Sequence, residues 1–341
     1  MKIAVDAMGG DQAPQVVVAG VEQARDLYPE LEFDLYGDPQ QVTPLIQDST
    51  RLKIVPTSEI IEMGEEPVRA IRKKKDSSIA QAATAVKEGR ADAFFSAGNT
   101  GAILAAGLLI VGRIKGIDRP GLTSILPITQ SGSDQTRFVY LDTGANAESK
   151  TKNLLQYAIM GKFYAENVLK VANPRVALLN NGAEEDKGDS FHKEVHQMLK
   201  QTADLNFVGN VEAGDLLYGK ADVIVSDGWT ANAALKATEG TAKMFMNLIK
   251  DGVKQGGWRA LLGAWLLKPA LKRIKNQMST STYGGAVLLG LKAPVVKTHG
   301  SSDAEAIKNT IVQIKQMIDA NLIGQTVDYF SADQTREKLD N

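Results

Sequence analysis

The stretch AFFSAGNTGAILAAG, residues 93–107, shows the local pattern that repeats along the chain and predicts the fold. It begins with a short run of bulky apolar residues, which is typical of a buried strand. The small polar turn GNTG, residues 98–101, comes next, and an apolar segment without strand alternation follows it. The stretch therefore predicts a strand that ends in a polar turn and leads into a buried helix.

The same order of strand, turn and helix recurs along the chain. Apolar or β-branched runs that lead into Gly, Asn, Asp or Ser begin near residues 2, 33, 52, 138, 176, 206 and 222. Segments with helical spacing lie between them, at residues 15–28, 78–90 and 152–168. Strands that alternate with helices favour a mainly parallel sheet with helices on both faces. We therefore predict an α/β fold, built as a single elaborated domain over residues 1–341.

Composition excludes several classes of protein. The formal net charge of −1 over 341 residues argues against nucleic acid as the main partner. The absence of cysteine removes disulfides, thiolate metal ligands and a cysteine nucleophile. The N-terminus lacks the apolar core of a signal peptide, and the longest apolar run, residues 101–112, falls short of the roughly 20 residues that cross a bilayer. We expect a folded cytoplasmic protein.

Small polar residues follow five of the expected strands, and in open parallel sheets ligands bind beyond the carboxyl ends of the strands. We therefore expect these turns to converge on one crevice that binds substrate. The turns contain Asp6, Gly9, Gly10 and Asp11; Ser96, Gly98, Asn99 and Thr100; Asp142, Gly144 and Asn146; Asn180, Asn181 and Gly182; and Asp227, Gly228 and Thr230.

Three of the expected helices begin at such turns, after residues 98–100, 227–228 and 300–302. Free amides and the dipole at a helix N-terminus favour an anion, so the set indicates phosphate chemistry. The alternative is that these are ordinary turns and caps, since Ser302 and Glu305 have the spacing of a capping box. Neither a dinucleotide-binding glycine motif nor a P-loop is present, so nucleotide binding is unsupported.

The chain has three histidines. His192 and His196 share one helical face, a spacing that metal pairs use, but a solvated helix face is far more common, and we predict no metal site and no cofactor. His299 stands beside a glycine and two serines, where it either donates to an anion or caps a turn.

The segment EEPVRAIRKKKDSS, residues 65–78, carries a basic run that includes Arg72, Lys73 and Lys74. Such a run is by default a solvated patch. The sharper alternative is a docking face for an acidic macromolecule, because complementary charge raises encounter rates and fixes orientation.

Residues 253–278 predict an amphipathic helical hairpin. Trp258, Leu262 and Trp265 fall on one helical face, and Pro269 is expected to end the first helix. Lys268 and Lys272 belong to a basic excess, since residues 252–302 contain eight lysines and arginines and no acidic residue. Tryptophan beside lysine suits the surface of an anionic bilayer. The alternative is a helix pair packed in the core or at a subunit interface.

Eight segments, in order along nearly the whole chain, resemble the bacterial phosphate acyltransferases of phospholipid synthesis. They are MKIAVDAMGGDQAP from residue 1, EEPVRAIRKKKDSS from 65, SAGNTGA from 96, VGRIKGIDRP from 111, LDTGAN from 141, DGWTAN from 227, TYGGAVLLGLKAPV from 282 and KTHGSSD from 297.

This resemblance implies an enzyme that moves a long-chain fatty acyl group from acyl carrier protein to inorganic phosphate. It implies a three-layer α/β/α sandwich, related to phosphate acetyltransferases and to isocitrate and isopropylmalate dehydrogenases. It also implies a homodimer held peripherally at the inner face of the cell membrane, where the acyl phosphate passes to a membrane glycerol-3-phosphate acyltransferase. The alternatives are a phosphate acetyl- or butyryltransferase that uses acyl-coenzyme A, and a non-catalytic scaffold at the membrane.

The expected chemistry needs neither an enzyme nucleophile nor a metal, because phosphate is an anionic nucleophile and a thioester is activated. We expect Asn99, Lys187, Asp227 and His299 to be catalytic. Lys187 lies in a family-like pattern with Asn180, Gly182, Glu184 and Gly188, and it is expected to neutralise phosphate. The expected substrate-binding residues are Asp6, Gly9, Gly10, Gly98, Thr100, Asp142, Asn146, Asn180, Gly228, Thr230, Ser301 and Ser302.

Overall fold

The computed structural model describes residues 1–129, 136–278 and 283–339. The strands are β1 (Lys2–Asp6), β2 (Glu32–Gly37), β3 (Leu52–Pro56), β4 (Ala93–Ser96), β5 (Gly121–Pro127), β6 (Arg137–Leu141), β7 (Arg175–Asn180), β8 (Asn206–Glu212), β9 (Val223–Val225), β10 (Ala286–Leu289) and β11 (Val295–Lys297). The α-helices are α1 (Gln15–Leu27), α2 (Pro39–Val42), α3 (Pro67–Lys73), α4 (Ser78–Lys87), α5 (Thr100–Ala106), α6 (Thr151–Asn167), α7 (Ser190–Gln201), α8 (Gly228–Gln255), α9 (Gly257–Met278), α10 (Ala304–Asp319) and α11 (Leu322–Leu339).

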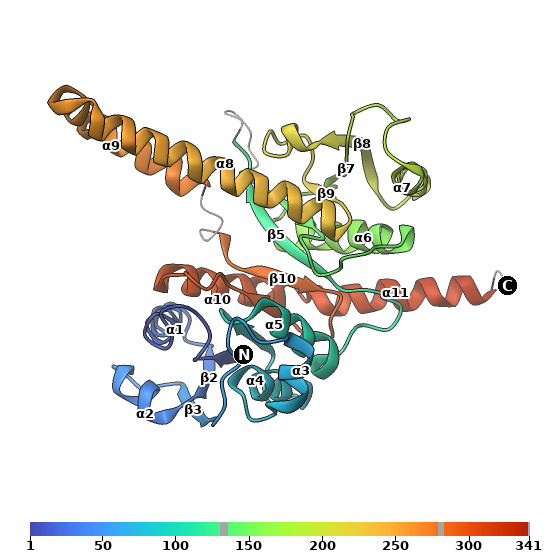
Figure 1. The fold of residues 1–341 in the computed structure, drawn as a ribbon. Coiled ribbons are helices and arrows are strands. Elements are labelled where there is room, and N and C mark those ends of the chain that lie inside the picture. The colour runs from blue at the N-terminus through green and yellow to red at the C-terminus, as the bar shows by residue number, and fades with distance from the viewer. Residues whose placement is uncertain (130–135, 279–282, 340–341) are drawn as a thin grey trace.

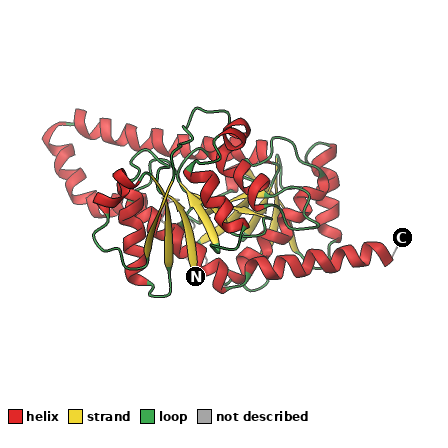
Figure 2. Cartoon of the chain, turned by 90° about the horizontal axis from the view of Figure 1, so that it is seen from below, coloured by secondary structure: helices red, strands yellow, loops and turns green. Residues whose placement is uncertain are grey.

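One sheet runs through the molecule, in the order β3-β2-β1-β4-β11-β10-β5-β6-β9-β7-β8. Helices cover both of its faces (Figures 1 and 2). Among the described strands, seven neighbouring pairs are parallel and three, all involving β5 or β10, are antiparallel. The α/β sandwich with a mainly parallel sheet is therefore confirmed.

The antiparallel strands in the middle reverse the direction of the sheet between its two halves. The first half comprises β1 to β4 and β11, and the second half comprises β6 to β9. Phe95 of β4 lies level with Val296 of β11, which pairs with Val287 of β10. Val287 pairs with Thr123 of β5, and Thr123 pairs with Leu141 at the end of β6. The carboxyl ends of the two halves therefore meet at one level, although their strands run in opposite directions.

The core forms on both faces of this sheet. Strands β1, β4 and β6 are almost wholly buried, as apolar runs covered by helices on both sides must be. Helices α1 and α10 approach closely at Gly20, where an added Cβ would lie 2.5 Å from Ile307 Cβ. Only a residue without a side chain permits that contact.

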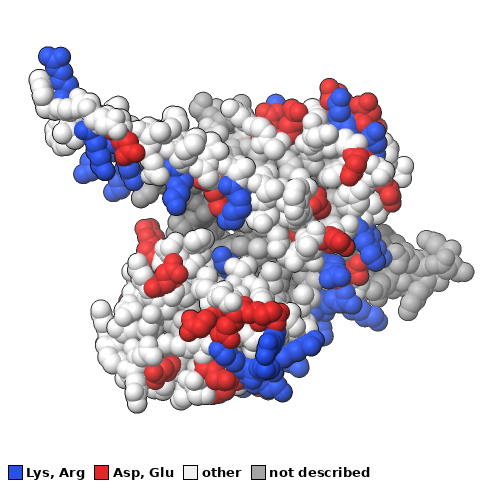
Figure 3. All heavy atoms as spheres, in the orientation of Figure 1, with Lys and Arg blue, Asp and Glu red and all other residues white. Residues whose placement is uncertain are grey.

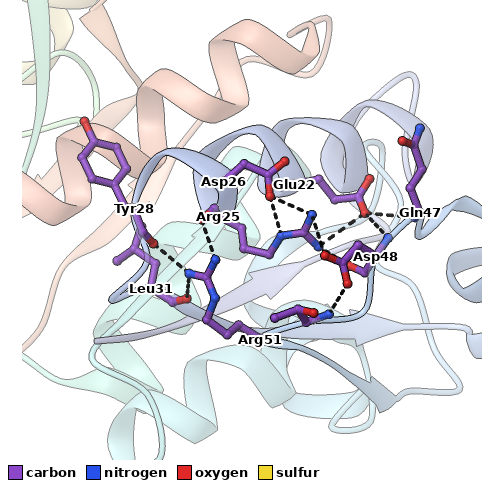
Figure 4. A network of polar contacts seen from close by, with 9 residues as sticks. Glu22, Arg25, Asp26, Tyr28, Leu31, Gln47, Asp48 and Arg51 are labelled. Carbon is purple, nitrogen blue, oxygen red and sulfur yellow. Dashed lines mark hydrogen bonds and ion pairs between the residues drawn. The ribbon is translucent and has the colours of Figure 1, made fainter.

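A buried ion network fastens the chain after α2 to α1 (Figure 4). The guanidinium of Arg25 is almost inaccessible and pairs with Asp26 at 2.8 Å and Glu22 at 3.5 Å. It also donates to the carbonyl of Asp48, while Glu22 accepts the backbone N–H of Asp48 at 3.1 Å. Because the network lies at the edge of the first half, its effect is on stability and not on the site.

Helices α8 and α9 form a long hairpin that projects from the second half (Figure 1). The expected hairpin over residues 253–278 is wrong in its boundaries and in its turn. The chain reverses at Gly256 and Gly257, and Gly257 has φ +68°, which glycine adopts without strain. Pro269 lies inside α9 and does not end it. An interior proline removes one backbone hydrogen bond and its ring clashes with the carbonyl four residues before it, so Pro269 weakens α9 without ending it.

Candidate active site

A cavity of about 280 Å³ opens where the carboxyl ends of the two halves meet. Figure 3 shows the molecule hollowed between its halves, below the base of α8, with basic and acidic side chains near the rim. The lining residues are Thr100, Leu122, Ser124, Ile125, Leu126, Thr143, Gly144, Asn232, Leu235, Lys236, Glu239, Gly284, Gly285, Ala286, Lys297, His299 and Ser302. They come from both halves, so the cavity exists only in the assembled fold.

The cavity combines an apolar wall with a cationic one. Strand β5 and Leu235 contribute the aliphatic side chains. Lys297 at the end of β11 and Lys236 on α8 contribute two ammonium groups, and Glu239 pairs with Lys236 at 2.7 Å. Such a wall suits a ligand that has an anionic group and an apolar part.

His299 faces this cationic wall. The backbone N–H of Ser301 donates to Nδ1 of His299 at 3.2 Å, so a neutral ring carries its proton on Nε2. Burial lowers the pKa of His299, and the neighbouring charges of Lys297 and Lys236 lower it further. The ring is therefore neutral at pH 7 and can donate one hydrogen bond to an oxygen that develops negative charge.

Asn99 has a structural role that sequence reasoning missed. Its side chain is 5% exposed, and its Oδ1 accepts the N–H of Ala102 at 3.0 Å, which caps α5. Its Nδ2 donates to the carbonyls of Glu62, Met63 and Glu65. The amide is thus fully used, and Thr100, the next residue, is the one that lines the cavity.

All three helix starts that were expected to bind an anion carry a side-chain cap. Asn99 caps α5, Asp227 accepts the N–H of Thr230 at 2.9 Å to cap α8, and Asp303 accepts the N–H of Ala306 at 2.9 Å to cap α10. The capping-box reading of Ser302 is therefore wrong, because Asp303 is the cap. Since two of the caps are acidic, the positive charge of the cavity comes from lysines and not from helix ends.

The turns of the first half pack tightly on one another. Ser96 donates to Asp6 at 2.5 Å and accepts the N–H of Gly98 at 2.9 Å. Burial raises the pKa of Asp6, although Ser78 and Ser96 donate hydrogen bonds to it. A Cβ on Gly9 would lie 2.4 Å from the Asp6 carboxylate. Asp6, Gly9 and Gly98 are therefore engaged in packing between the turns of the first half, and none of the three lines the cavity.

Gly10 joins the same packing from the loop after β1. Its φ of +117° favours glycine, and the next N–H, of Asp11, donates to the carbonyl of Gly300 at 2.8 Å. This contact fixes the loop after β1 against the loop that carries His299. Ser302 of that loop lines the cavity, and the Ser301 hydroxyl lies 2.9 Å from Nδ1 of His299.

Asp142 organises the turn after β6. It is buried and accepts the N–H groups of Leu122, Ala145 and Asn146 at 2.8–3.0 Å. Burial raises the pKa of Asp142, and those hydrogen bonds oppose the rise. The Asn146 side chain donates to Asp142 at 2.9 Å. Both residues thus position Thr143 and Gly144, which line the cavity.

Gly228, at the start of α8, allows the closest approach in the site. An added Cβ would lie 2.1 Å from the carbonyl oxygen of Asn146 and 3.0 Å from Asp142. The glycine therefore lets α8 begin directly against the turn after β6, and this places Asn232 and Lys236 in the cavity one and two turns later.

His192 lies between two carboxylates. Its Nδ1 is 2.7 Å from Asp189, the cap of α7, and its Nε2 is 3.7 Å from Asp227, the cap of α8. The nearby Asp227 carboxylate raises the pKa of His192 against the opposing effect of burial. Burial disfavours the Asp227 anion, but the neighbouring His192 and the hydrogen bond from Thr230 outweigh it and hold the pKa of Asp227 at about 2. His196 is buried instead, 2.9 Å from Asn210.

Lys187 lies apart from the cavity. Asn180 donates to the carbonyl of Lys187 at 3.3 Å and so holds the loop after β7, but the Lys187 side chain is 45% exposed, 4.0 Å from Glu184. Neither residue lines the cavity. Like the turn after β1, the turn after β7 therefore contributes no residue to the lining of this cavity.

The basic run is at the end of α3, where Figure 3 shows basic side chains beside a band of acidic ones. Arg72 and Lys73 are exposed. Lys74 is not free, because its ammonium pairs with Glu65 at 2.6 Å and donates to the carbonyl of Ile60 at 2.7 Å. The first residue of α3, Pro67, touches Gly101 of α5, so this surface adjoins the element that begins at Thr100.

The α8–α9 hairpin exposes large apolar side chains. Trp258 and Trp265 are 70% and 68% exposed, Leu262 is also exposed, and Lys268 and Lys272 lie on the same helix. Exposed apolar residues of α8 add to this surface; they are Met244, Phe245 and Leu248. Among the described residues, no helix has the length and hydropathy needed to cross a membrane.

Several lining residues were missed by sequence reasoning. Lys297 and Asn232 lie within the segments KTHGSSD and DGWTAN, but neither is among the predicted site residues. The sequence does hold a signal for Lys297: it ends a predicted apolar run and stands two residues before His299. Ser124 has no such signal, because it stands inside strand β5. Only the assembled sheet shows that this part of β5 lines the cavity.

Residues 1–325 match a family model described as "Fatty acid synthesis protein". A protein of Limosilactobacillus reuteri (strain DSM 20016) named phosphate acyltransferase is 74% identical over 341 residues, which cover 100% of this chain and 98% of the relative. A phosphate acyltransferase of Levilactobacillus brevis is 59% identical over 97% of this chain and 96% of its own length.

Solved structures with little sequence identity share the fold. A phosphotransacetylase from Streptococcus pyogenes has a TM-score of 0.59 at 17% identity, covering 95% of this chain and 94% of its own. A branched-chain phosphotransacylase from Enterococcus faecalis V583 has a TM-score of 0.58 at 15% identity, covering 93% of this chain and 99% of its own.

Proposed function

Since the chain belongs to the family of fatty acid synthesis proteins and is an enzyme that transfers acyl groups to phosphate, we propose that its donor is long-chain acyl-acyl carrier protein. The product is then acyl phosphate, a precursor for phospholipid synthesis. The observation that carries this proposal is the cavity between the halves, which offers ammonium groups and a neutral histidine beside an aliphatic wall. The ammonium groups suit phosphate, the histidine N–H suits the thioester carbonyl, and the aliphatic wall suits the acyl chain.

The reaction we propose is one direct displacement. An oxygen of hydrogen phosphate attacks the thioester carbonyl carbon, and a carbon–oxygen bond forms. The tetrahedral intermediate collapses, the carbon–sulfur bond breaks, and the thiolate leaves. The proton of hydrogen phosphate ends on the thiol, so neither an added acid nor an acyl-enzyme is needed. The protein supplies position and charge, which accounts for the greater part of the rate in such transfers.

His299 is proposed as the oxyanion donor. Its neutral Nε2–H is the group that can stabilise negative charge on the former carbonyl oxygen, and the Ser301 N–H on Nδ1 fixes the tautomer. Thr100 and Ser302 face the same cavity and supply hydroxyl donors for phosphate. Asn99, Asp142 and Asp227 act through the turns and helix starts that they hold.

Acyl carrier protein is proposed to dock on Arg72 and Lys73. These side chains are exposed on α3, and the start of α3 is fixed to α5 by Asn99 and by the contact of Pro67 with Gly101. A carrier bound there would stand beside the element that leads into the cavity. Lys74 is left out of this surface because Glu65 already pairs with it.

The hairpin is proposed to hold the enzyme at the inner face of the cell membrane. Its exposed tryptophans and leucines can enter the headgroup region, and Lys268 and Lys272 can pair with anionic lipids. A homodimer joined through part of the same surface is compatible with this arrangement. Peripheral attachment would release an apolar product directly to a membrane glycerol-3-phosphate acyltransferase.

The decisive experiment is an assay of thiol release from defined donors. Palmitoyl-acyl carrier protein should release free carrier thiol only when phosphate is present, with formation of acyl phosphate. Palmitoyl- and acetyl-coenzyme A in parallel reactions test the coenzyme A alternative. A kcat/KM for a coenzyme A thioester equal to that for acyl carrier protein, or an acyl-protein adduct trapped during turnover, would contradict the proposal.

A further inference from the structure

We infer that Lys297 is the group that binds the phosphate substrate in the cavity, in place of the lysine that the sequence pattern indicates, Lys187. This inference rests on the proposed function, since it assigns the acceptor site of that reaction.

The backbone of Lys297 is fixed by strand pairing, but among the described residues its ammonium has no partner. Its backbone is held on both sides of β11, level with Ser96 of β4 and Ala286 of β10. In the described part of the chain, its ammonium has neither an ion pair nor a hydrogen bond, and it lines the cavity. A half-buried ammonium without a counter-ion is costly, and an anion in the cavity would remove that cost.

The charges around Lys297 favour an anion. Burial lowers the pKa of Lys297, and the neighbouring Lys236 lowers it further. The other titratable groups that act on this corner are Glu239 on α8, His299, and Asp11 on the loop after β1. Glu239 is already paired with Lys236, so the charge that remains to be neutralised is that of Lys297.

The two lysines differ in what surrounds them. Lys187 is solvated, lies 4.0 Å from Glu184, and stands outside the cavity. Water therefore screens its charge, and the nearby carboxylate opposes an anion. Lys297 stands two residues before the proposed oxyanion donor, so phosphate on its ammonium would lie beside the thioester carbonyl. Lysine suits this role as a compact point charge.

The test compares Lys297→Gln with two matched variants, Lys187→Gln in the predicted motif and the exposed Lys292→Gln just before β11. Two measurements are made on each full-length protein. The first is the KM for phosphate against the KM for acyl-acyl carrier protein. The second is the Kd for inorganic phosphate, measured by calorimetry without any acyl donor.

Lys297→Gln should raise the KM and Kd for phosphate about 10-fold or more, the effect of losing a charge-assisted contact, and leave the KM for the donor within about 2-fold. Both control variants should bind phosphate as the unaltered enzyme does. A Lys297→Gln protein with an unchanged phosphate Kd overturns the inference, as does a Lys187→Gln protein that alone loses phosphate.

The calorimetric arm separates this inference from the proposed function. If the enzyme uses no acyl-carrier donor, phosphate binding still reports on Lys297. If thiol release is phosphate-dependent but insensitive to Lys297, the function stands and the assignment falls. Lys297→Met keeps the length of the side chain and serves as the second variant, should urea unfolding show that Lys297→Gln is less stable.

Discussion

His192 joins the starts of two helices through their acidic caps, Asp189 and Asp227. Two consequences of this arrangement can be separated by pH. The pKa of His192 is raised, so its stabilising effect is complete below the ordinary histidine value and disappears as pH rises through the raised one. The pKa of Asp227 is about 2, so its contribution persists above about pH 4 and is lost on acidification towards pH 2.

We therefore expect His192→Gln to lower the free energy of unfolding by about 2 kcal/mol at pH 5.5, the scale of a hydrogen bond to a charged group. At pH 9 the loss should be much smaller, because the unaltered histidine is then neutral. Urea unfolding at the two pH values measures the difference. Lys193→Gln, at an exposed position on the same helix, is the control and should be insensitive to pH. An equal loss at both values would disprove the charged bridge.

His299 gives a prediction for catalysis. Replacing it with alanine should lower kcat about 100-fold, as the loss of an oxyanion donor does, with little change in the KM for phosphate. His299→Gln keeps an N–H near the position of Nε2 and should retain more activity than His299→Ala. Steady-state kinetics with both substrates saturating provide the measurement. Similar kcat values for the alanine variant and the unaltered enzyme would remove His299 from the mechanism.

At the scale of elements, the hairpin gives the next prediction. Trp258→Glu with Trp265→Glu should release the enzyme from vesicles that contain anionic lipid, because two exposed apolar anchors become acidic. Turnover of substrates in solution should remain largely intact, since neither residue lines the cavity. Vesicle flotation measures the binding. Leu27→Glu, an exposed apolar position at the end of α1, is the control and should still float. Flotation of the double tryptophan variant would refute membrane contact.

Helix α3 gives a second prediction at this scale. Arg72→Glu with Lys73→Glu should raise the KM for acyl carrier protein at least about 10-fold and leave that for phosphate nearly unchanged, since reversed charge repels an acidic partner. The effect should weaken at high salt. Lys170→Glu with Lys193→Glu makes the same change in charge on the other half and should have little effect. Equal changes in both KM values would place the carrier elsewhere.

For the whole molecule, the question is whether the two halves unfold together. Tyr164 of α6 and Gln313 of α10 form a buried hydrogen bond of 2.8 Å, and Gln313 also accepts the N–H of Gly285 before β10 at 2.8 Å. This contact links helices from opposite halves beside the central strands. Because one sheet is continuous through both halves, we expect cooperative unfolding.

Tyr164→Phe should lower the free energy of unfolding by about 1 to 3 kcal/mol, because it leaves the Gln313 amide buried without its partner. Hydrogen exchange in urea, followed on peptides from α4 and from α7, should show the same lowered midpoint in both halves. Midpoints that separate in the variant would show that the halves unfold independently.

The residues of the site were only partly predictable from the sequence. His299, Thr100 and Ser302 stand in turns beside glycine and do line the cavity. Asn99 and Lys187 look equally functional in the sequence. In the structure, the Asn99 amide caps α5 and donates to backbone carbonyls, whereas the Lys187 ammonium lies in solvent. Their side-chain partners come from loops far away in the chain, which local patterns do not specify.

By itself, the sequence determined the α/β class, the strand and helix segments and the family, because apolar periodicity and turn residues act over short distances and the motifs are long. Only the tertiary structure decided where the strands reverse, where the hairpin turns and which cations share a cavity. The antiparallel β5 and β10 bring the carboxyl ends of two opposed halves to one level, and this register depends on pairing of β10 with β5 and of β11 with β4, segments more than a hundred residues apart. Lys297 and Lys236 became neighbours for that reason, and the charge of the site is a property of the assembled sheet.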